Sequence, residues 1–366
     1  MLASTSMDRP YVEQLRIQGY GCVQDATLQL TPLHALVGPN DSGKSTVLRA
    51  LRTLSSVLER ALGAPAPDTL GRGAPASASK GPGGSLFEVS AASTTWRVEL
   101  DAEGRARTTS FPRDLEPPSL LDDADEEEVT TGGTGPERPA PDIVRALRGT
   151  QVLRLDPDAL RSPHPLIPDG QPLSFADERG AGLPAVYDAI ISRDLPAYIE
   201  LNEELTRLFP SVRSVHLGNP SPTTKAIGVK LEGGAVVPAA LMSEGMLYYL
   251  AFAALPHLDP TPLLLVEEPE RGLHPARIAD VMRALRILSE KTQVLLATHS
   301  PLVVNELQPE EVTVVTRAGE QGMKATRILG TPGFEDRARV YALGELWLSY
   351  ANGADEAPLL GGGPRP

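Results

Sequence analysis

Short apolar runs separated by turn residues dominate the beginning of the chain. They predict three short β-strands, at residues 15–17, 26–30 and 34–37, and the third run stops at Gly38. After Gly43, apolar side chains recur at the spacing of one buried helical face, at Val47, Leu51, Leu54 and Leu58. The pattern therefore predicts strands followed by a loop and a helix that ends near Gly63.

Similar patterns continue through the middle of the chain. They predict a hairpin at 86–89 and 95–100, a strand at 151–155, a helical region at 183–209, and strands at 212–217, 226–231 and 235–237. From Leu241 onward helical and strand patterns alternate, and they end in a strand at 312–316 and a helix near 341–348. This alternation favours an α/β fold.

Two internal segments and the tail interrupt these patterns. Residues 63–85 are rich in Gly, Pro, Ala and Ser, residues 112–141 contain an acidic run, and the residues from Ala351 onward are again rich in Gly and Pro. Such segments have little apolar surface to bury, so we expect mobile or disordered loops and a frayed tail. For the acidic run a solvated loop is the simplest interpretation, and mimicry of nucleic acid is the alternative.

Composition and charge narrow the class of protein. The 366 residues, 41% of them hydrophobic, suffice for one large or two ordinary domains. The net charge is −13, but eight acidic residues between Asp114 and Glu128 supply most of it, which argues against a broad basic face for DNA without excluding a local one. Cys22 is the single cysteine and cannot form an internal disulfide. Because no apolar stretch reaches the roughly 18 residues that span a bilayer, we expect a soluble, cytoplasmic protein with no membrane partner.

The loop after the third strand carries the strongest motif. Gly38 to Ser45 reads GPNDSGKS and matches G-x-x-x-x-G-K-[ST] between a predicted strand and a predicted helix. Its backbone N–H groups and the helix N-terminus can hold phosphate, Lys44 can reach the β- and γ-phosphates, and the Ser45 hydroxyl can bind Mg²⁺. We expect nucleotide contacts from Gly38, Pro39, Asn40, Asp41, Ser42, Gly43, Lys44, Ser45 and Thr46.

A pair of acids at the end of an apolar strand provides the second half of a phosphate-hydrolysing site. Four aliphatic residues, 263–266, precede Glu267 and Glu268. Adjacent side chains at a strand end leave in different directions, so we assign Glu267 to the metal and Glu268 to the attacking water. The interval of 223 residues from Lys44 to Glu267 and the absence of an N-K-x-D sequence make a GTPase a poor interpretation.

Two further residues lie at positions that suit the same site. Ser243 opens an apolar helix shortly before the acidic strand, where a serine is also an ordinary N-cap. His299 follows the apolar run 294–297, so it is expected at the carboxyl-end edge of the sheet, where open α/β sheets bind ligands.

Together these motifs resemble the ABC-type ATPase heads of SMC, RecF and OLD proteins. The elements are Gly38 to Ser45 as Walker A, Ser243-Glu244-Gly245 as signature, Glu267 to Pro275 as Walker B and D-loop, and His299 as switch histidine. The opening residues 15–20, the run 268–275 and Thr298 to Pro301 are especially similar to standalone bacterial ATPases of the OLD and RecF-like group. The resemblance implies an α/β, ABC-ATPase-type P-loop fold with a mixed sheet, a β-subdomain and an inserted helical lobe.

The resemblance also implies a mechanism. Two protomers would sandwich two ATP molecules, so that Ser243 and Gly245 contact the γ-phosphate bound at Lys44 of the opposite subunit. Lys44, Glu268 and His299 would be catalytic, Ser45 and Glu267 would hold Mg²⁺, and residues 270–274 would line the two-fold axis. Hydrolysis would then loosen the homodimer.

The expected domain organisation follows from these elements. Residues 1–62 would form the N-terminal part of the ATPase head, 63–150 a hairpin region with the Gly/Pro-rich and acidic insertions, and 151–240 a helical lobe with connecting strands. Residues 241–350 would complete the head, and 351–366 would be a flexible tail.

The sequence departs from the family pattern at three places. Glu267 stands where the metal-binding residue is usually Asp, and the signature reads Ser-Glu-Gly rather than Ser-Gly-Gly. No glutamine is assigned to the Q-loop, for which Gln151 and the neighbourhood of Asp156 both remain open.

The leading functional hypothesis is an ATP-hydrolysing regulator that dimerises around ATP. Because 67 residues follow His299, we expect no nuclease domain of the kind OLD nucleases carry, and a separate effector such as a nuclease would supply cutting. The setting would be bacterial anti-phage defence or DNA maintenance. The alternatives are a nucleotide-gated scaffold with negligible hydrolysis and a RecF-like DNA-repair binding protein.

Overall fold

The computed structural model describes residues 10–63, 84–114, 139–317, 322–331 and 333–351. Most of the two predicted loop segments, including the acidic run after Asp114, and the tail from 352 onward lie outside these residues. Across the described chain, no helix combines the length and the apolar character needed to cross a membrane.

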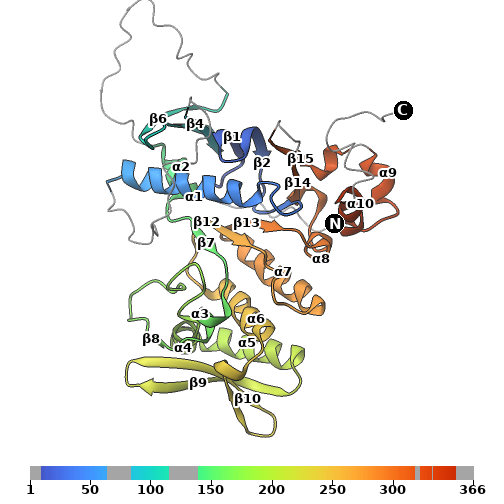
Figure 1. The fold of residues 1–366 in the computed structure, drawn as a ribbon. Helices are drawn as coiled ribbons and strands as arrows, with labels where there is room; N and C mark the ends of the chain where they lie inside the picture. Colours follow the sequence, from blue (N-terminus) through green and yellow to red (C-terminus); the bar gives the residue numbers. More distant parts are fainter. Residues whose placement is uncertain (1–9, 64–83, 115–138, 318–321, 332, 352–366) are drawn as a thin grey trace, which may run out of the picture.

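A six-stranded mixed sheet forms the centre of the molecule (Figure 1). Its strand order is β15 (Met323–Arg327), β14 (Val312–Arg317), β3 (Leu33–Val37), β13 (Gln293–Thr298), β12 (Leu263–Glu267) and β7 (Gln151–Leu153). All neighbours are parallel except β15, which is antiparallel to β14. The register places Val37 opposite Thr298 and Ala297 opposite Glu267, so β3, β13 and β12 end at the same edge.

A second, antiparallel sheet lies beyond the first long helix. Its order is β2 (Val23–Gln29), β1 (Gln14–Tyr20), β4 (Ser85–Ala91), β5 (Thr94–Leu100) and β6 (Ala106–Pro112). Helix α1 (Lys44–Ala61) shares one apolar core with this sheet, with α2 (Pro141–Leu147) and with one face of the central sheet. The predicted apolar stripe of α1 is completely buried there, which explains why the sequence folds this way.

The opposite face of the central sheet carries a helical lobe. Its helices are α3 (Pro157–Arg161), α4 (Leu183–Arg193), α5 (Leu195–Leu208), α6 (Glu244–Ala254), α7 (Pro275–Ser289) and α8 (Pro301–Asn305). Strands β8 (His164–Pro165), β9 (Val212–Ser221), β10 (Thr224–Leu231) and β11 (Val236–Pro238) form a small sheet at its end. Helices α9 (Phe334–Ala338) and α10 (Leu343–Ala351) follow the central sheet. Short 3-10 turns lie at Ala239–Leu241, Leu255–His257, Pro309–Glu311 and Ile328–Gly330.

Strand β3, which is apolar except for His34, lies between the two cores. Leu33, Ala35 and Val37 of β3 belong to the core on the lobe side, whereas Leu36 belongs to the core around α1. Because successive side chains of a strand point to opposite faces, a strand covered on both sides is expected to be mostly apolar. Burial on both faces therefore explains the apolar sequence from which β3 is predicted.

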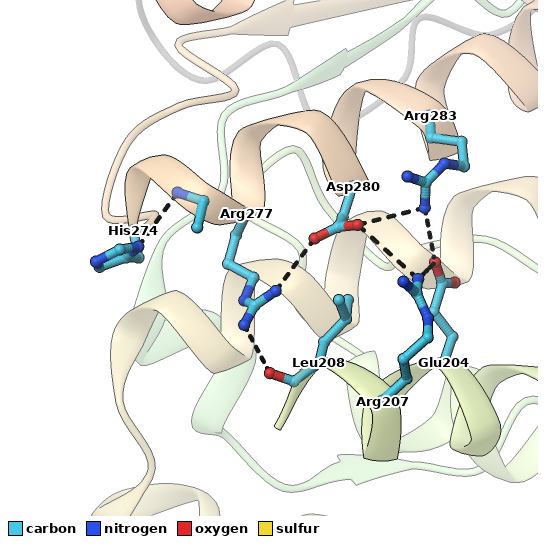
Figure 2. A network of polar contacts seen from close by, with 8 residues as sticks. Glu204, Arg207, Leu208, His274, Arg277, Asp280 and Arg283 are labelled. Carbon is cyan, nitrogen blue, oxygen red and sulfur yellow. Dashed lines mark hydrogen bonds and ion pairs between the residues drawn. The ribbon is translucent and has the colours of Figure 1, made fainter. Parts of the chain in front are cut away.

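Charged side chains join α5 to α7, the helix that follows the acid pair (Figure 2). Asp280, whose side chain is 8% exposed, lies 3.3 Å from both Arg277 and Arg283, and Arg283 also contacts Glu204 of α5. Arg277 donates a hydrogen bond to the carbonyl of Leu208 at 2.7 Å. A buried carboxylate with several cationic partners is satisfied, so this network holds α5 against α7.

The α/β architecture with a mixed sheet is confirmed, and several expected details are corrected. The pattern predicts that order resumes at Gln151, but α2 already begins at Pro141. It predicts neither β6, whose residues 107–110 are polar and are held by pairing with β5, nor β15. The helical region 183–209 is two helices, because Asp194 interrupts it and caps α5 by accepting a hydrogen bond from the N–H of Ala197.

Candidate nucleotide site

The GPNDSGKS loop connects the end of β3 to the start of α1. Gly43, with φ of +111°, occupies the N-cap position, and the backbone N–H groups of Thr46 and Val47 both contact its carbonyl. Gly38 has no room for a side chain, because a Cβ there would lie 2.2 Å from the carbonyl oxygen of Val315. Both glycines are therefore required by the close path of the loop.

The loop has features that fit a bound phosphate. The Ser42 hydroxyl is buried and has no hydrogen-bond partner. The first turn of α1 contains no acidic residue, so the positive end of its dipole is not neutralised from within the helix. A phosphate would satisfy the orphaned donor and the free N–H groups of the helix N-terminus.

Lys44 is held inside this loop. Its Nζ donates hydrogen bonds to the carbonyls of Gly38 and Pro39, each at 2.7 Å, and the residue is 9% exposed. Burial lowers the pKa of the Lys44 ammonium, and the carboxylates of Glu268, Glu270 and Asp41 oppose that shift. The lysine therefore faces a cluster of negative charge across the loop.

The acid pair after β12 diverges, as expected for neighbouring side chains. Glu268 has a left-handed backbone, with φ of +48°, and its N–H donates to the carbonyl of Ala297 at 2.8 Å. Its carboxylate lies 3.8 Å from Nδ1 of His299, whereas the Glu267 carboxylate lies 3.7 Å from Nε of Arg154. A non-glycine residue in this conformation is strained, and such strain is characteristic of functional sites.

His299 leaves the end of β13 beside two carboxylates. Its Nδ1 lies 3.5 Å from Oε1 of Glu270 and 3.8 Å from Oε1 of Glu268. The structure thus brings His299, Glu268 and the charge of Lys44 to one edge of the sheet. Glu270 and Arg154 also belong to this edge. The sequence predicts Glu270, a third acid two residues beyond Glu268, only within the run 270–274 along the two-fold axis and not beside His299. It predicts no role for Arg154, which lies in the predicted strand 151–155.

The proposed metal ligands have suitable chemistry. A serine hydroxyl and a carboxylate are oxygen donors of the type that Mg²⁺ prefers, and Ser45 is exposed at the start of α1. Glu267 is 19% exposed and is already paired with Arg154. Within the described residues, no group of three or more Asp, Glu, His or Cys side chains forms a ready metal site. Ser45 and Glu267 therefore fit a metal ion whose other ligands are water molecules and phosphate oxygens.

The remaining loop residues divide into exposed and internal ones. Pro39, Asn40 and Asp41 are exposed, and Asp41 has a positive φ of 64°. The Thr46 side chain is buried, and its hydroxyl lies 3.4 Å from Sγ of Cys22. The Thr46 side chain therefore contacts the β1–β2 turn and does not point into the phosphate loop.

The signature serine lies on the other side of the sheet from its own phosphate loop. Ser243 is exposed and caps α6, where its hydroxyl accepts a hydrogen bond from the N–H of Met246 at 3.3 Å. Helix α6 belongs to the lobe-side core, whereas α1 belongs to the other core. Within the described chain, no hydrogen bond or ion pair joins Ser243 to the Lys44 loop. Gly245 lies against the carbonyl of Gly272, 3.0 Å from where its Cβ would be, so the signature contacts the loop after Glu268.

Within the described residues, neither of the two Q-loop candidates, Gln151 and Asp156, makes a hydrogen bond or ion pair with the acid pair. Gln151 pairs with Leu264 within the sheet, and Asp156 caps α3 and contacts Arg179 at 2.9 Å. Arg154, at the end of β7, is the residue that reaches Glu267. A cavity of about 490 Å³ beside β7 does not include any residue of the Lys44 loop.

Comparison with known proteins identifies the family of this chain. The family model described as "AAA domain, putative AbiEii toxin, Type IV TA system" matches residues 33–305, a range that includes Lys44, Ser243, Glu268 and His299. The OLD nuclease of Thermus scotoductus is 45% identical over 40 residues, which are 11% of this chain and 8% of that relative. The matched segment thus spans a small part of the relative's length.

Solved structures share the fold. The SmcHead bound to the C-winged helix domain of ScpA is 17% identical, with a TM-score of 0.58 over 87% of this chain and 98% of that chain. The Smc head domain with an extended coiled coil bound to the C-terminal domain of ScpA, derived from Pyrococcus furiosus, is 14% identical, with a TM-score of 0.52 over 90% of this chain and 100% of that chain. The P-loop fold of an SMC-type ATPase head, expected from the motifs, is therefore confirmed.

Proposed function

The chain belongs to the AAA-domain family that matches it over residues 33–305, and on that premise we propose that it binds ATP with Mg²⁺ at the Lys44 loop and hydrolyses it. We further propose that two chains close around two ATP molecules and that this cycle regulates a separate effector protein.

The observation that carries the proposal is the meeting of three strand ends. Lys44, Glu268 and His299 follow β3, β12 and β13, which are adjacent parallel strands ending in register. The carboxyl ends of parallel strands are where α/β folds bind ligands. A phosphate loop, a strained carboxylate and a histidine at one such edge support phosphoryl transfer to water.

Each residue has a role that its position permits. The loop N–H groups, the Ser42 hydroxyl and Lys44 hold the phosphates, and Lys44 exchanges its two carbonyl contacts for phosphate oxygens. Glu268 accepts a proton from the attacking water, and His299 donates a hydrogen bond to the γ-phosphate. When bound to Ser45 and Glu267, Mg²⁺ would neutralise charge on the phosphates.

Exposure of the signature supports a composite site. Within the described residues Ser243 makes no hydrogen bond to its own loop, and it is exposed at the N-terminus of an eleven-residue helix. A second copy would bring its Ser243 and Gly245 to the γ-phosphate of the first.

The effector and the biological setting rest on the named relatives. The family description refers to a toxin and a toxin–antitoxin system, and the short match is to a nuclease. The two Smc heads are bound to domains of a separate protein, ScpA. These names support a chain that acts with another protein, such as a nuclease, in bacterial defence or DNA maintenance.

Substitution of the general base tests the hydrolysis step. We expect Glu268→Gln to bind ATP as the wild type does, to hydrolyse it about 10²- to 10⁴-fold more slowly and to accumulate an ATP-dependent dimer. Phosphate release and light scattering with and without ATP and Mg²⁺ measure both effects. Glu290→Gln, an exposed acid at the end of α7, is the matched control. Unchanged hydrolysis in Glu268→Gln would remove Glu268 from the mechanism.

A nucleotide-gated scaffold with negligible hydrolysis is the second candidate. The ion pair between Arg154 and Glu267 favours it, because a metal at that carboxylate has to displace the guanidinium. Phosphate release by the wild type, measured with and without DNA, separates the two functions. Background release together with intact ATP-dependent dimerisation would support the scaffold.

A further inference from the structure

Glu270 is an almost buried acid at the edge of the candidate site. It lies in the loop between β12 and α7, and its side chain is 10% exposed. One of its oxygens, Oε2, is buried without a hydrogen-bond partner. Because an unpaired buried carboxylate oxygen is costly, the position of this side chain calls for a compensating role.

The other oxygen holds the junction between β13 and α8. Oε1 accepts hydrogen bonds from the hydroxyl of Thr298 at 2.7 Å and from the backbone N–H of His299 at 3.3 Å. The N–H of Ser300 donates to the same Thr298 hydroxyl at 3.0 Å. A single carboxylate therefore fixes three consecutive residues, and Thr298 is completely buried.

The same oxygen lies beside the histidine ring. Nδ1 of His299 is 3.5 Å from Oε1 of Glu270, so the carboxylate faces one ring nitrogen and leaves Nε2 as the nitrogen available to a ligand. The ring is half exposed. Without this contact it would have several rotamers to choose from.

Lys44 provides the opposite charge across the site. The negative charges of Glu268 and Glu270 both oppose the lowering of the Lys44 pKa by burial. The carboxylate of Glu270 thus contributes to the electrostatics of Lys44 and also contacts both the backbone and the ring of His299.

We propose that Glu270 is a positioning residue, which holds Thr298 and His299 so that the imidazole faces the γ-phosphate bound at Lys44. This inference rests on the proposed ATPase function, because it assigns an orientation to a histidine of that site. Glu270 does not itself take the proton of the attacking water, a role that belongs to Glu268.

Three variants and one control test the proposal in the full-length chain. Glu270→Ala removes both acceptors, Glu270→Gln keeps one oxygen but removes the charge, and Thr298→Val removes only the buried hydroxyl while keeping the side-chain shape. Glu290→Gln is again the control. Thermal unfolding establishes that each variant is folded, and Glu270→Gln and Thr298→Val serve if Glu270→Ala does not fold.

Hydrogen exchange of the chain without nucleotide is the first readout. We expect the amides of His299 and Ser300 to exchange faster in Glu270→Ala and Thr298→Val than in the wild type, with no change in peptides from α4 or β5. This measurement does not depend on hydrolysis. Unchanged exchange at both amides would overturn the proposal even if the chain proves to be an active ATPase.

Steady-state kinetics and nucleotide binding are the second readout. We expect kcat to fall by about 10- to 100-fold in Glu270→Ala, less in Thr298→Val, and KM and ADP affinity to stay within about twofold of the wild type. A parallel loss of ADP affinity would overturn the proposal, because it would make Glu270 a nucleotide contact. If the wild type releases no phosphate, the proposed hydrolysis fails and the exchange experiment alone decides the role of Glu270.

Discussion

At the scale of single residues, His34 shows how a polar side chain enters an apolar strand. It is completely buried in β3, with Nδ1 3.1 Å from the hydroxyl of Thr31 and Nε2 2.9 Å from that of Thr313. Burial lowers the pKa of His34 to about 3, and the charge of Arg327 adds to this shift. The ring is therefore neutral in the folded protein and acts as a hydrogen-bond bridge between β3 and β14.

The depressed pKa of His34 predicts acid sensitivity. Since the unfolded chain binds a proton near pH 6.5 and the folded chain near pH 3, this residue costs stability as the pH falls through that window. From pH 7.5 to 5 the loss attributable to His34 is about 2 kcal/mol. Denaturant unfolding at both pH values measures this loss. We expect the free energy of unfolding to change less between the two pH values in His34→Asn than in the wild type. The comparison is necessary because burial also lowers the pKa of His257. Equal pH dependence in both proteins would contradict this prediction.

At the scale of elements, prediction succeeded where the local pattern and the tertiary environment agree. The strand, loop and helix from Leu33 to Ala61 were predictable because β3 is a short, mostly apolar run buried on both faces, whereas α1 buries one face with the helical period. Strand β6 was not, because its polar residues become a strand only through pairing with β5. The contacts of Glu270 could not be predicted from the sequence either, because its partners Thr298 and His299 are close to it in space but distant along the chain.

The contact between α6 and the loop after Glu268 gives an element-scale prediction. Gly272 has φ of +69°, and a Cβ there would lie 2.3 Å from the Tyr248 ring of α6. Gly104 has a similar φ of +78° but no atom within 4 Å, so it is the matched control. We expect Gly104→Ala to destabilise by about 1 kcal/mol through its backbone alone, and Gly272→Ala by about 1–3 kcal/mol more, because Tyr248 must move. Denaturant unfolding measures both, and equal costs would show that the ring adapts freely.

At the scale of the whole molecule, the central sheet separates two cores and two parts of one proposed site. Helix α1, which follows the phosphate loop, belongs to one core, whereas the signature helix α6 belongs to the core of the lobe. Figure 1 shows α1 and α6 on opposite sides of β12 and β13. In the proposed dimer a second chain completes the site, so we expect nucleotide binding and dimerisation to be linked.

A charged substitution at Ser243 distinguishes the effect on nucleotide-linked dimerisation from the effect on the stability of α6. Asp and Asn are both good N-caps, so either can replace Ser243 in accepting the hydrogen bond from the Met246 N–H without weakening α6. In the proposed dimer, however, the aspartate would face the γ-phosphate of the partner chain, and like charges repel. We therefore expect Ser243→Asp to bind ATP as a monomer and Ser243→Asn to retain the ATP-dependent dimer, both measured by light scattering in the Glu268→Gln background. Loss of affinity for ATP in the isolated monomer would instead mean that Ser243 serves its own loop, and a dimer of undiminished strength in Ser243→Asp would rule out a shared γ-phosphate.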